Sequence, residues 1–208
     1  KYFEKRQRKG VTLHDAKKIM RERNYFGCMM LENGEADAMV SGLTRNYPNT
    51  IRPALHIIGK DDRVNKVAGM YIMLTKKGVL FFADATVNQR PTAEDLADIT
   101  LLTAKAVENF NITPRVAMLS YTNFGSTDGD TPRRVQKARE LVKQRRPDLI
   151  VDGDIQGNFA LNQNLLEENF PFSELVGGAA NVLIFPSLSA GNICYKILQE
   201  FLRLIYMF

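Results

Sequence analysis

The sequence predicts an α/β protein with three layers, in which helices cover both faces of a mostly parallel sheet. Continuous apolar strands alternate with helices through the second half of the chain, which is typical of a parallel sheet buried on both faces. The 208 residues are 45% hydrophobic and 25% charged, so the chain can bury one substantial core or two small ones. No internal repeat or low-complexity linker interrupts this pattern.

The first elements are short. Thr12 followed by Asp15 predicts a capping box and a helix that continues to about Arg23, because a short polar side chain satisfies the free amides of a first turn. The Pro- and Asn-rich segment RNYPN predicts a loop, and TIRPAL opens a helix with Pro53 near its start, where a missing amide proton costs little. Between these helices, two apolar runs predict short strands over residues 26–31 and 36–42.

The remaining elements follow a regular alternation. Two β-rich runs joined by a turn at Gly78 predict a hairpin. Pro91 and Thr92 then start the longest clear helix, in which apolar residues from Leu96 to Phe110 repeat at helical spacing. Beyond Pro114 we expect strands over 115–121, 148–152 and 181–186, each followed by a helix, over 133–145, 158–170 and 192–208.

Cysteine and histidine usage argues against a metal or disulfide protein. Cys28 and Cys194 lie far apart inside apolar runs, and only His14 and His56 accompany them. We expect both cysteines to be reduced core residues, with no metal site and a cytoplasmic location.

Neither a membrane nor a nucleic acid is expected as a partner. The N-terminus has basic residues without an apolar stretch behind them, so it does not resemble a signal peptide. The apolar C-terminal run is interrupted by Lys196, Glu200 and Arg203 and is shorter than the roughly 20 residues of a membrane helix. The net charge of +5 is spread over several basic clusters without interleaved aromatic residues, which indicates solvated helix faces and loops.

Polar loops follow three of the predicted strands. Because functional groups of parallel sheets gather at the carboxyl ends of the strands, these loops are the candidate site. The loop SYTNFGSTDG can form an anion-binding concavity of backbone amides or can simply be a long polar loop. Its spacing matches neither a P-loop nor a dinucleotide fingerprint. The candidate ligand-binding residues of the three loops are Ser120, Thr122, Asn123, Gly125, Ser126, Asp152, Gln156 and Asn192.

Two arginines and two aspartates are further candidates. Arg6 and Arg52 carry guanidinium forks that suit a phosphate or carboxylate, although a lone arginine is more often a surface ion pair. Asp152 and Asp154 can accept protons or hold a cation, but capping of the following helix is the expected role. No Ser/His/Asp set is present, so the chain carries no complete catalytic constellation of that type.

Seven blocks in order carry a family resemblance: RKG, FGCMMLENGEADAMVSG, TIRPAL, PTAEDLADI, PRVAMLSY, RPDLIVDG and IFPSLSAGNICYK. Over nearly the whole chain they resemble the phosphate acetyltransferase and butyryltransferase family. Details such as GLTRNYPNTIRPAL look closest to the phosphotransacetylase-like domain fused behind the catalytic half of bacterial NAD(P)-dependent malic enzymes.

The resemblance implies a fold and a ligand. The fold would be isocitrate/isopropylmalate dehydrogenase-like and incomplete at both ends, with a partial first α/β subdomain over 1–62, a second over 63–208, and a cleft between them for coenzyme A and an acyl phosphate. By similarity, Arg6 and Arg52 would hold the phosphate, the loops beginning at Ser120 and Ser189 would line the cleft, and Asn192 would lie near the coenzyme. Family members also associate into homo-oligomers.

The resemblance also implies a missing catalytic part. Family members continue into a segment with a Ser-Arg pair and a nearby Asp that promote attack by the coenzyme A thiol, and this sequence ends at Phe208 before such a segment. We therefore expect a regulatory or interaction module that binds acetyl-CoA without transferring the acyl group, linked to a malic-enzyme part that alone would use NAD(P) and a divalent metal. The alternatives are a genuine phosphate acetyl- or butyryltransferase whose sequence is clipped, or a purely structural oligomerisation domain.

Overall fold

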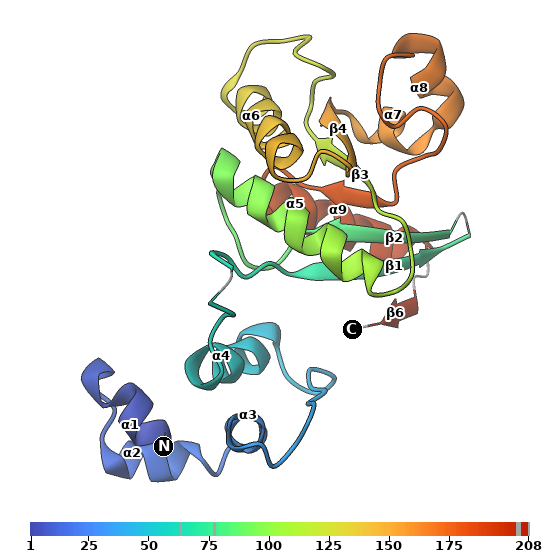
Figure 1. The fold of residues 1–208 in the computed structure, drawn as a ribbon. Helices are drawn as coiled ribbons and strands as arrows, with labels where there is room; N and C mark the ends of the chain where they lie inside the picture. The colour runs from blue at the N-terminus through green and yellow to red at the C-terminus, as the bar shows by residue number, and fades with distance from the viewer. Residues whose placement is uncertain (63, 77, 203–204, 208) are drawn as a thin grey trace. The chain divides into compact units, whose positions relative to one another are not determined.

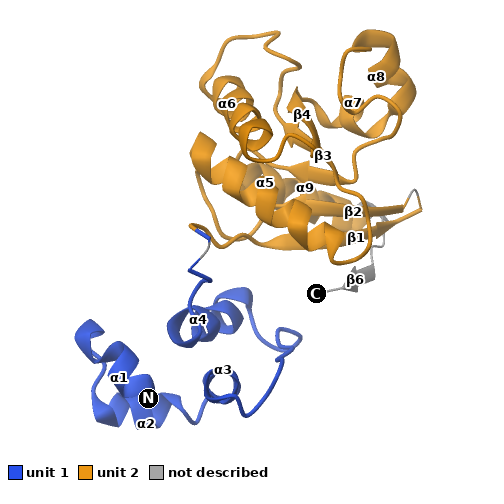
Figure 2. Ribbon diagram, in the orientation of Figure 1, with its two compact units in different colours: residues 1–64 blue, residues 65–208 orange. Residues whose placement is uncertain are grey.

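Two compact units make up the chain. The computed structural model describes residues 1–62, 64–76, 78–202 and 205–207. Its internal contacts divide the chain into unit 1, Lys1–Val64, and unit 2, Asn65–Phe208 (Figure 2). The boundary lies two residues beyond residue 62, the position that the family resemblance implies.

Helices joined by loops make up the described residues of unit 1. It contains α1 (Tyr2–Arg6), the 3-10 helix η1 (Gln7–Lys9), α2 (Leu13–Ile19), α3 (Arg23–Asn33) and α4 (Tyr47–Ile57). Its small core gathers buried side chains from several of these helices, namely Tyr2, Ala16, Tyr25, Cys28 and Ile57.

The two strands expected in this unit are wrong. Residues 26–31 lie within α3, and residues 36–42 adopt no strand in the described part of the chain. Glu22 starts α3 because its carboxylate accepts from the amides of Asn24 and Tyr25, at 2.9 and 3.2 Å. Gly34 ends the helix with a φ of 74°, a left-handed conformation that glycine adopts without strain. The apolar run FGCMML is therefore one helix segment rather than a strand.

The helix starts of unit 1 are partly as expected. The Thr12–Asp15 capping box is present, and it begins a helix that ends at Ile19 rather than near Arg23. Helix α4 begins three residues before the TIRPAL motif, with Pro48 in its first turn, so Pro53 lies inside the helix instead of near its start.

Unit 2 confirms the predicted α/β fold. Its sheet has the strand order β4-β3-β5-β2-β1-β6, with β4, β3, β5 and β2 mutually parallel and with antiparallel pairing on both sides of β1 (Figure 1). The elements are β1 (Met70–Thr75), β2 (Gly78–Ala83), α5 (Ala93–Glu108), β3 (Arg115–Leu119), α6 (Asp130–Arg145), β4 (Ile150–Ile155), α7 (Gly157–Leu161), α8 (Gln163–Asn169), β5 (Val182–Ile184), α9 (Leu188–Leu202) and β6 (Ile205–Met207).

Helices cover both faces of this sheet. Helices α5 and α6 pack on one face, where their apolar residues meet Val116 and Met118 of β3. Helices α7, α8 and α9 pack on the other face, against Ala117 and Leu119 of the same strand. Successive residues of β3 thus point to opposite layers, as the continuous apolar strand predicted.

Two of the expected helices differ from the prediction. The segment 158–170 forms two short helices that are separated at Asn162, whose side chain accepts from the amide of Leu165 at 3.2 Å and caps α8. The C-terminal helix ends at Leu202 and strand β6 follows it, while Arg203, Leu204 and Phe208 lie outside the described residues. Among the described residues, no helix has the length and apolar character needed to cross a membrane. Cys28 and Cys194 are both free, and Cys194 is only half-buried.

Candidate functional site

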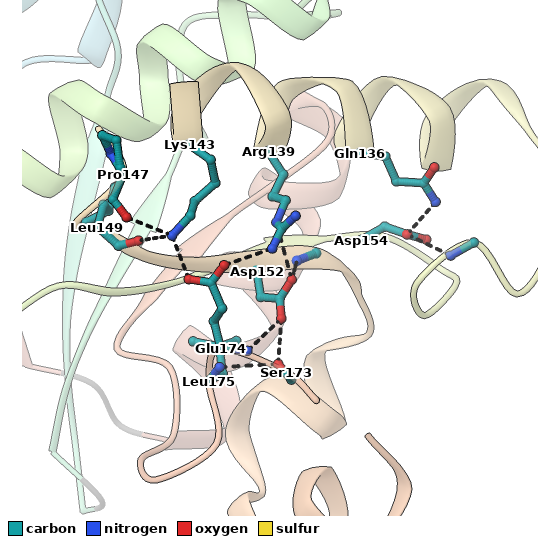
Figure 3. Close-up of polar contacts among 12 residues, drawn as sticks. Gln136, Arg139, Lys143, Pro147, Leu149, Asp152, Asp154, Ser173, Glu174 and Leu175 are labelled. Atoms are coloured by element: carbon teal, nitrogen blue, oxygen red, sulfur yellow. Dashed lines mark hydrogen bonds and ion pairs between the residues drawn. The ribbon is translucent and has the colours of Figure 1, made fainter. Parts of the chain in front are cut away.

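Polar loops follow the carboxyl ends of the parallel strands, and buried carboxylates order two of them, the loops after β3 and β2. Asp154, at the end of β4, is completely buried. Its side chain accepts hydrogen bonds from the Thr122 hydroxyl and from the Gly125 amide at 3.0 Å. It also accepts from Gln136 Nε2 at 2.9 Å (Figure 3). The Ser120 hydroxyl contacts that of Thr122 at 3.0 Å. One carboxylate therefore orders the loop that follows β3.

A second set of contacts ties the same loop to the end of β4. Asn123 Nδ2 donates to Gln156 Oε1 at 2.9 Å, and the Gln156 amide donates to Asn123 Oδ1 at 2.8 Å. Gln156 Nε2 also donates to the Tyr121 carbonyl at 2.7 Å. The Ser126 hydroxyl accepts weakly from the Asn123 amide at 3.3 Å. The predicted residues between Ser120 and Ser126, together with Gln156, thus form one network.

Asp152 belongs to a different environment. Its carboxylate accepts from the Ser173 hydroxyl at 2.7 Å and the Glu174 amide at 2.9 Å, and it lies 3.5 Å from Arg139 Nε. Arg139 and Lys143 both pair with Glu174, at 2.9 and 2.7 Å, so the cluster is an ion network between α6 and the segment before β5 (Figure 3).

The expected helix-capping role of the two aspartates is wrong. Helix α7 has Gln156 at its N-cap and no side-chain cap. Asp154 accepts a hydrogen bond from the loop after β3, and Asp152 accepts hydrogen bonds from the turn at Ser173 and Glu174. Both carboxylates therefore accept from groups distant in sequence, which local spacing does not reveal.

A buried aspartate that the sequence analysis missed orders the loop after β2. Asp84 is 2% exposed and accepts from the amides of Thr86, Val87 and Asn88 at 2.8, 3.0 and 2.8 Å. Asn192 of α9 donates to the carbonyl of Ala85 in the same loop, at 3.3 Å. The predicted residue Asn192 thus lies beside the loop after β2. The motif DATVN directly behind an apolar strand was the signal that could have identified Asp84.

Helix α6 contributes two more polar side chains that the sequence analysis missed. Gln136 supports Asp154, as described above. Arg134 Nη2 donates to the Pro186 carbonyl at 3.2 Å, just beyond β5, and its Nε is buried without a hydrogen-bond partner. The Leu188 amide donates to the Gln89 carbonyl at 3.2 Å, so the loops after β5 and β2 are also joined.

Arg6 and Arg52 lie in unit 1, and both are close enough to His56 to affect its charge. Arg6 Nη2 contacts His56 Nε2 at 3.4 Å, and the Tyr25 hydroxyl contacts His56 Nδ1 at 3.1 Å. Arg52 precedes His56 by four residues on α4, so the two side chains share a helix face. Arg6 Nε is buried without a hydrogen-bond partner, and Arg52 is exposed. The unit 1 cluster of Arg6, Arg52, His56 and Tyr25 therefore presents two guanidinium groups close together.

The titratable groups of this cluster respond to burial and to the two arginines. Burial lowers the pKa of His56, and the positive charges of Arg6, Arg52 and Lys9 lower that pKa further. Burial, reinforced by Tyr2, raises the pKa of Tyr25. A neutral imidazole beside two fixed cations leaves the cluster able to attract an anion.

The polar groups of the two units are suited to anion binding and hydrogen bonding. No group of three or more His, Cys, Asp or Glu side chains that could hold a metal occurs within the described ranges. Unit 2 offers hydroxyls, amides and a guanidinium at the carboxyl ends of its strands. Unit 1 offers the paired guanidinium groups.

Comparisons with known proteins identify relatives along nearly the whole chain. The family described as phosphate acetyl/butaryl transferase matches residues 1–206. The chain is 39% identical to a phosphate acetyltransferase of Clostridium acetobutylicum, covering 97% of this chain and 62% of that protein. It is 38% identical to an NADP-dependent malic enzyme of Escherichia coli, covering 95% of this chain and 26% of that protein.

A solved structure agrees with these sequence matches. The EutD phosphotransacetylase from Staphylococcus aureus superposes with a TM-score of 0.84 at 35% identity, covering 99% of this chain and 63% of that one. The chain therefore spans less than two thirds of the length of each of these three proteins.

Proposed function

Because the chain belongs to the phosphate acetyl/butaryl transferase family, we propose that the full-length protein transfers an acyl group between coenzyme A and phosphate. The family resemblance drawn from the seven sequence blocks is confirmed. The observation that carries the proposal is the 39% identity to a phosphate acetyltransferase over 97% of the chain. It favours the transferase over the regulatory module expected from the motifs.

The reaction needs two kinds of group. In the direction of thioester synthesis, the coenzyme A sulfur attacks the acyl carbon of an acyl phosphate, the carbon–oxygen bond to phosphate breaks, and phosphate leaves as the thiol proton is released. The departing phosphate requires positive donors, and the thiol requires help in losing its proton.

The unit 1 cluster supports the first requirement. Arg6 and Arg52 present fixed positive charges with paired donors, and Arg6 Nη2 lies 3.4 Å from His56 Nε2. We assign the phosphate of the acyl phosphate to Arg6 and Arg52. We assign hydrogen bonding to coenzyme A to the loop beginning at Ser120 and to Asn192.

A direct assay tests the proposal. The purified full-length protein is mixed with acetyl phosphate and coenzyme A, and formation of acetyl-CoA is followed by the thioester absorbance. Turnover that depends on both substrates is expected, and its absence would refute the proposal. Arg52→Gln should raise the KM for acetyl phosphate about 10-fold, the effect of losing one charge-assisted contact. Arg21→Gln, which neutralises an exposed arginine outside the cluster, is the matched control and should change KM less than twofold.

A second candidate function rests on the malic-enzyme relative. The alignment with the Escherichia coli malic enzyme includes 95% of this chain but only 26% of the malic enzyme. A domain similar to this chain is therefore part of a longer oxidoreductase. In that case acetyl-CoA would bind this domain and modulate malate oxidation elsewhere on the parent chain. Acetyl-CoA-dependent change in NAD(P)-linked malate oxidation, together with no acyl transfer, would favour this candidate.

A further inference from the structure

Arg134 differs from the other arginines of α6. Arg133, Arg139 and Arg145 each lie close to a carboxylate, at 2.7, 2.9 and 2.5 Å. Among the described residues Arg134 has no such carboxylate, and the acceptor found for it is the Pro186 carbonyl. The Nε atoms of Arg134 and Arg139 are both buried without a hydrogen-bond partner, but Arg139 has carboxylates beside it whereas Arg134 has none among the described residues. A partly buried guanidinium that is left without a counter-charge costs stability unless an anion completes its environment.

The position of Arg134 is a point where anions commonly bind. Strands β3 and β5 are parallel neighbours in the sheet. The chain leaves β3 toward α6 on one face and leaves β5 toward α9 on the other face (Figure 1). Ligands of open α/β sheets bind beyond the carboxyl ends of strands at such a reversal. By reaching from α6 to Pro186 just after β5, Arg134 spans this reversal.

We propose that Arg134 binds a phosphoryl group of the ligand at the carboxyl ends of β3 and β5. The ligand class rests on the proposed function, because both coenzyme A and acyl phosphate carry phosphoryl oxygens that a guanidinium fork binds well. The assignment goes beyond the two arginines of the family resemblance, which lie in unit 1. The Ser187 hydroxyl, in the same loop as Pro186, accepts from the Ala190 amide at 3.3 Å and lies beside this position in sequence.

The test compares neighbouring arginines in the full-length protein. Arg134→Gln, Arg134→Lys and Arg133→Gln are titrated calorimetrically with inorganic phosphate and, separately, with coenzyme A. Arg133 is the matched control, because it lies on the same helix turn and pairs with the exposed carboxylate of Asp128. Arg134→Gln should raise the dissociation constant of one of these ligands about 10-fold or more, whereas Arg133→Gln should stay within twofold of the wild type.

Each result decides the assignment. A loss confined to inorganic phosphate assigns Arg134 to the acyl phosphate, and a loss confined to coenzyme A assigns it to a phosphate of the coenzyme. Equal dissociation constants for Arg134→Gln and wild type with both ligands would overturn the inference, as would failure of the wild type to bind either.

A conservative variant protects the test against misfolding. Should Arg134→Gln not fold, Arg134→Lys retains the charge but loses the fork. A smaller weakening of binding is then expected, and binding equal to wild type overturns the inference. If the wild type does not catalyse acyl transfer but Arg134→Gln still weakens ligand binding, the proposed function is refuted and the inference about Arg134 stands.

Discussion

Replacing the buried Asp154 with alanine should destabilise unit 2 more than replacing an exposed aspartate of the same loop. The carboxylate accepts three hydrogen bonds, and it is completely buried, as is its partner Thr122 at 3% exposure. In Asp154→Ala the Thr122 hydroxyl loses a buried partner, at about 1–3 kcal/mol. Gly125 is exposed and Gln136 is half-buried, so water can replace part of their bonds at about 1 kcal/mol each. The expected loss is about 3–5 kcal/mol, a large share of a typical domain stability of about 5–15 kcal/mol.

The measurement must isolate unit 2, because the chain has two compact units. Urea titrations of the 208-residue chain, read by hydrogen exchange of peptides from β3 and β4, give the free energy of unfolding of that unit. Asp128→Ala, in the same loop but with an exposed side chain, is the control and should cost less than about 0.5 kcal/mol. Asp154→Asn should fall between the two, since an amide keeps one acceptor oxygen. A loss below about 1 kcal/mol for Asp154→Ala would refute the view that one carboxylate organises this loop.

Three further predictions follow from local contacts. Thr92→Ala removes the side-chain acceptor at the start of α5 and should cost unit 2 about 1 kcal/mol, with Thr92→Ser near wild type; equal stability of both variants would contradict the capping role. The pKa of His56 is lowered in the folded state, so folded unit 1 binds fewer protons than the unfolded chain at pH values just below 6.5, the unfolded pKa. The free energy of unfolding should therefore be highest above pH 6.5 and should fall as the pH drops through the lowered pKa. His56→Gln should flatten this dependence in urea titrations read from unit 1, and an unchanged pH profile would count against it. Glu174→Gln weakens the pairs with Arg139 and Lys143, but Glu174 is 34% exposed, so we expect a loss of only about 0.5–1 kcal/mol that shrinks in high salt; a larger, salt-independent loss would be inconsistent with a solvent-screened network.

The sequence was most informative where strands were continuous and apolar. The run RVAML predicted β3 because both faces of that strand are buried, and the helix after Thr92 was predicted because its cap and its periodicity agree. The run FGCMML was misread, because a short apolar segment fits a buried strand and a buried helix equally well. The features that distinguish them, Glu22 before the run and Gly34 after it, lie at the ends of the helix.

The candidate site was predictable in place but not in its internal organisation. Parallel strands carry their carboxyl ends to one edge, so the loop beginning at Ser120 could be identified from the alternation of elements alone. Which carboxylate orders that loop depends on a contact between distant segments, and Asp152 and Asp154 look equivalent in sequence. Arg134 and Arg133 are adjacent in a basic stretch, and only the contact of one with Pro186 and the other with Asp128 separates them.

The dependence of one loop on a later strand has a consequence for biosynthesis. Thr122 precedes its carboxylate partner by 32 residues, and Gly125 precedes it by 29. As the nascent chain leaves the ribosome, the loop emerges before Asp154. The loop therefore cannot form its hydrogen bonds with this carboxylate until β4 has emerged. A ribosome that stalls after this loop has emerged but before β4 has emerged would therefore expose a loop without its ordering carboxylate to chaperones and proteases.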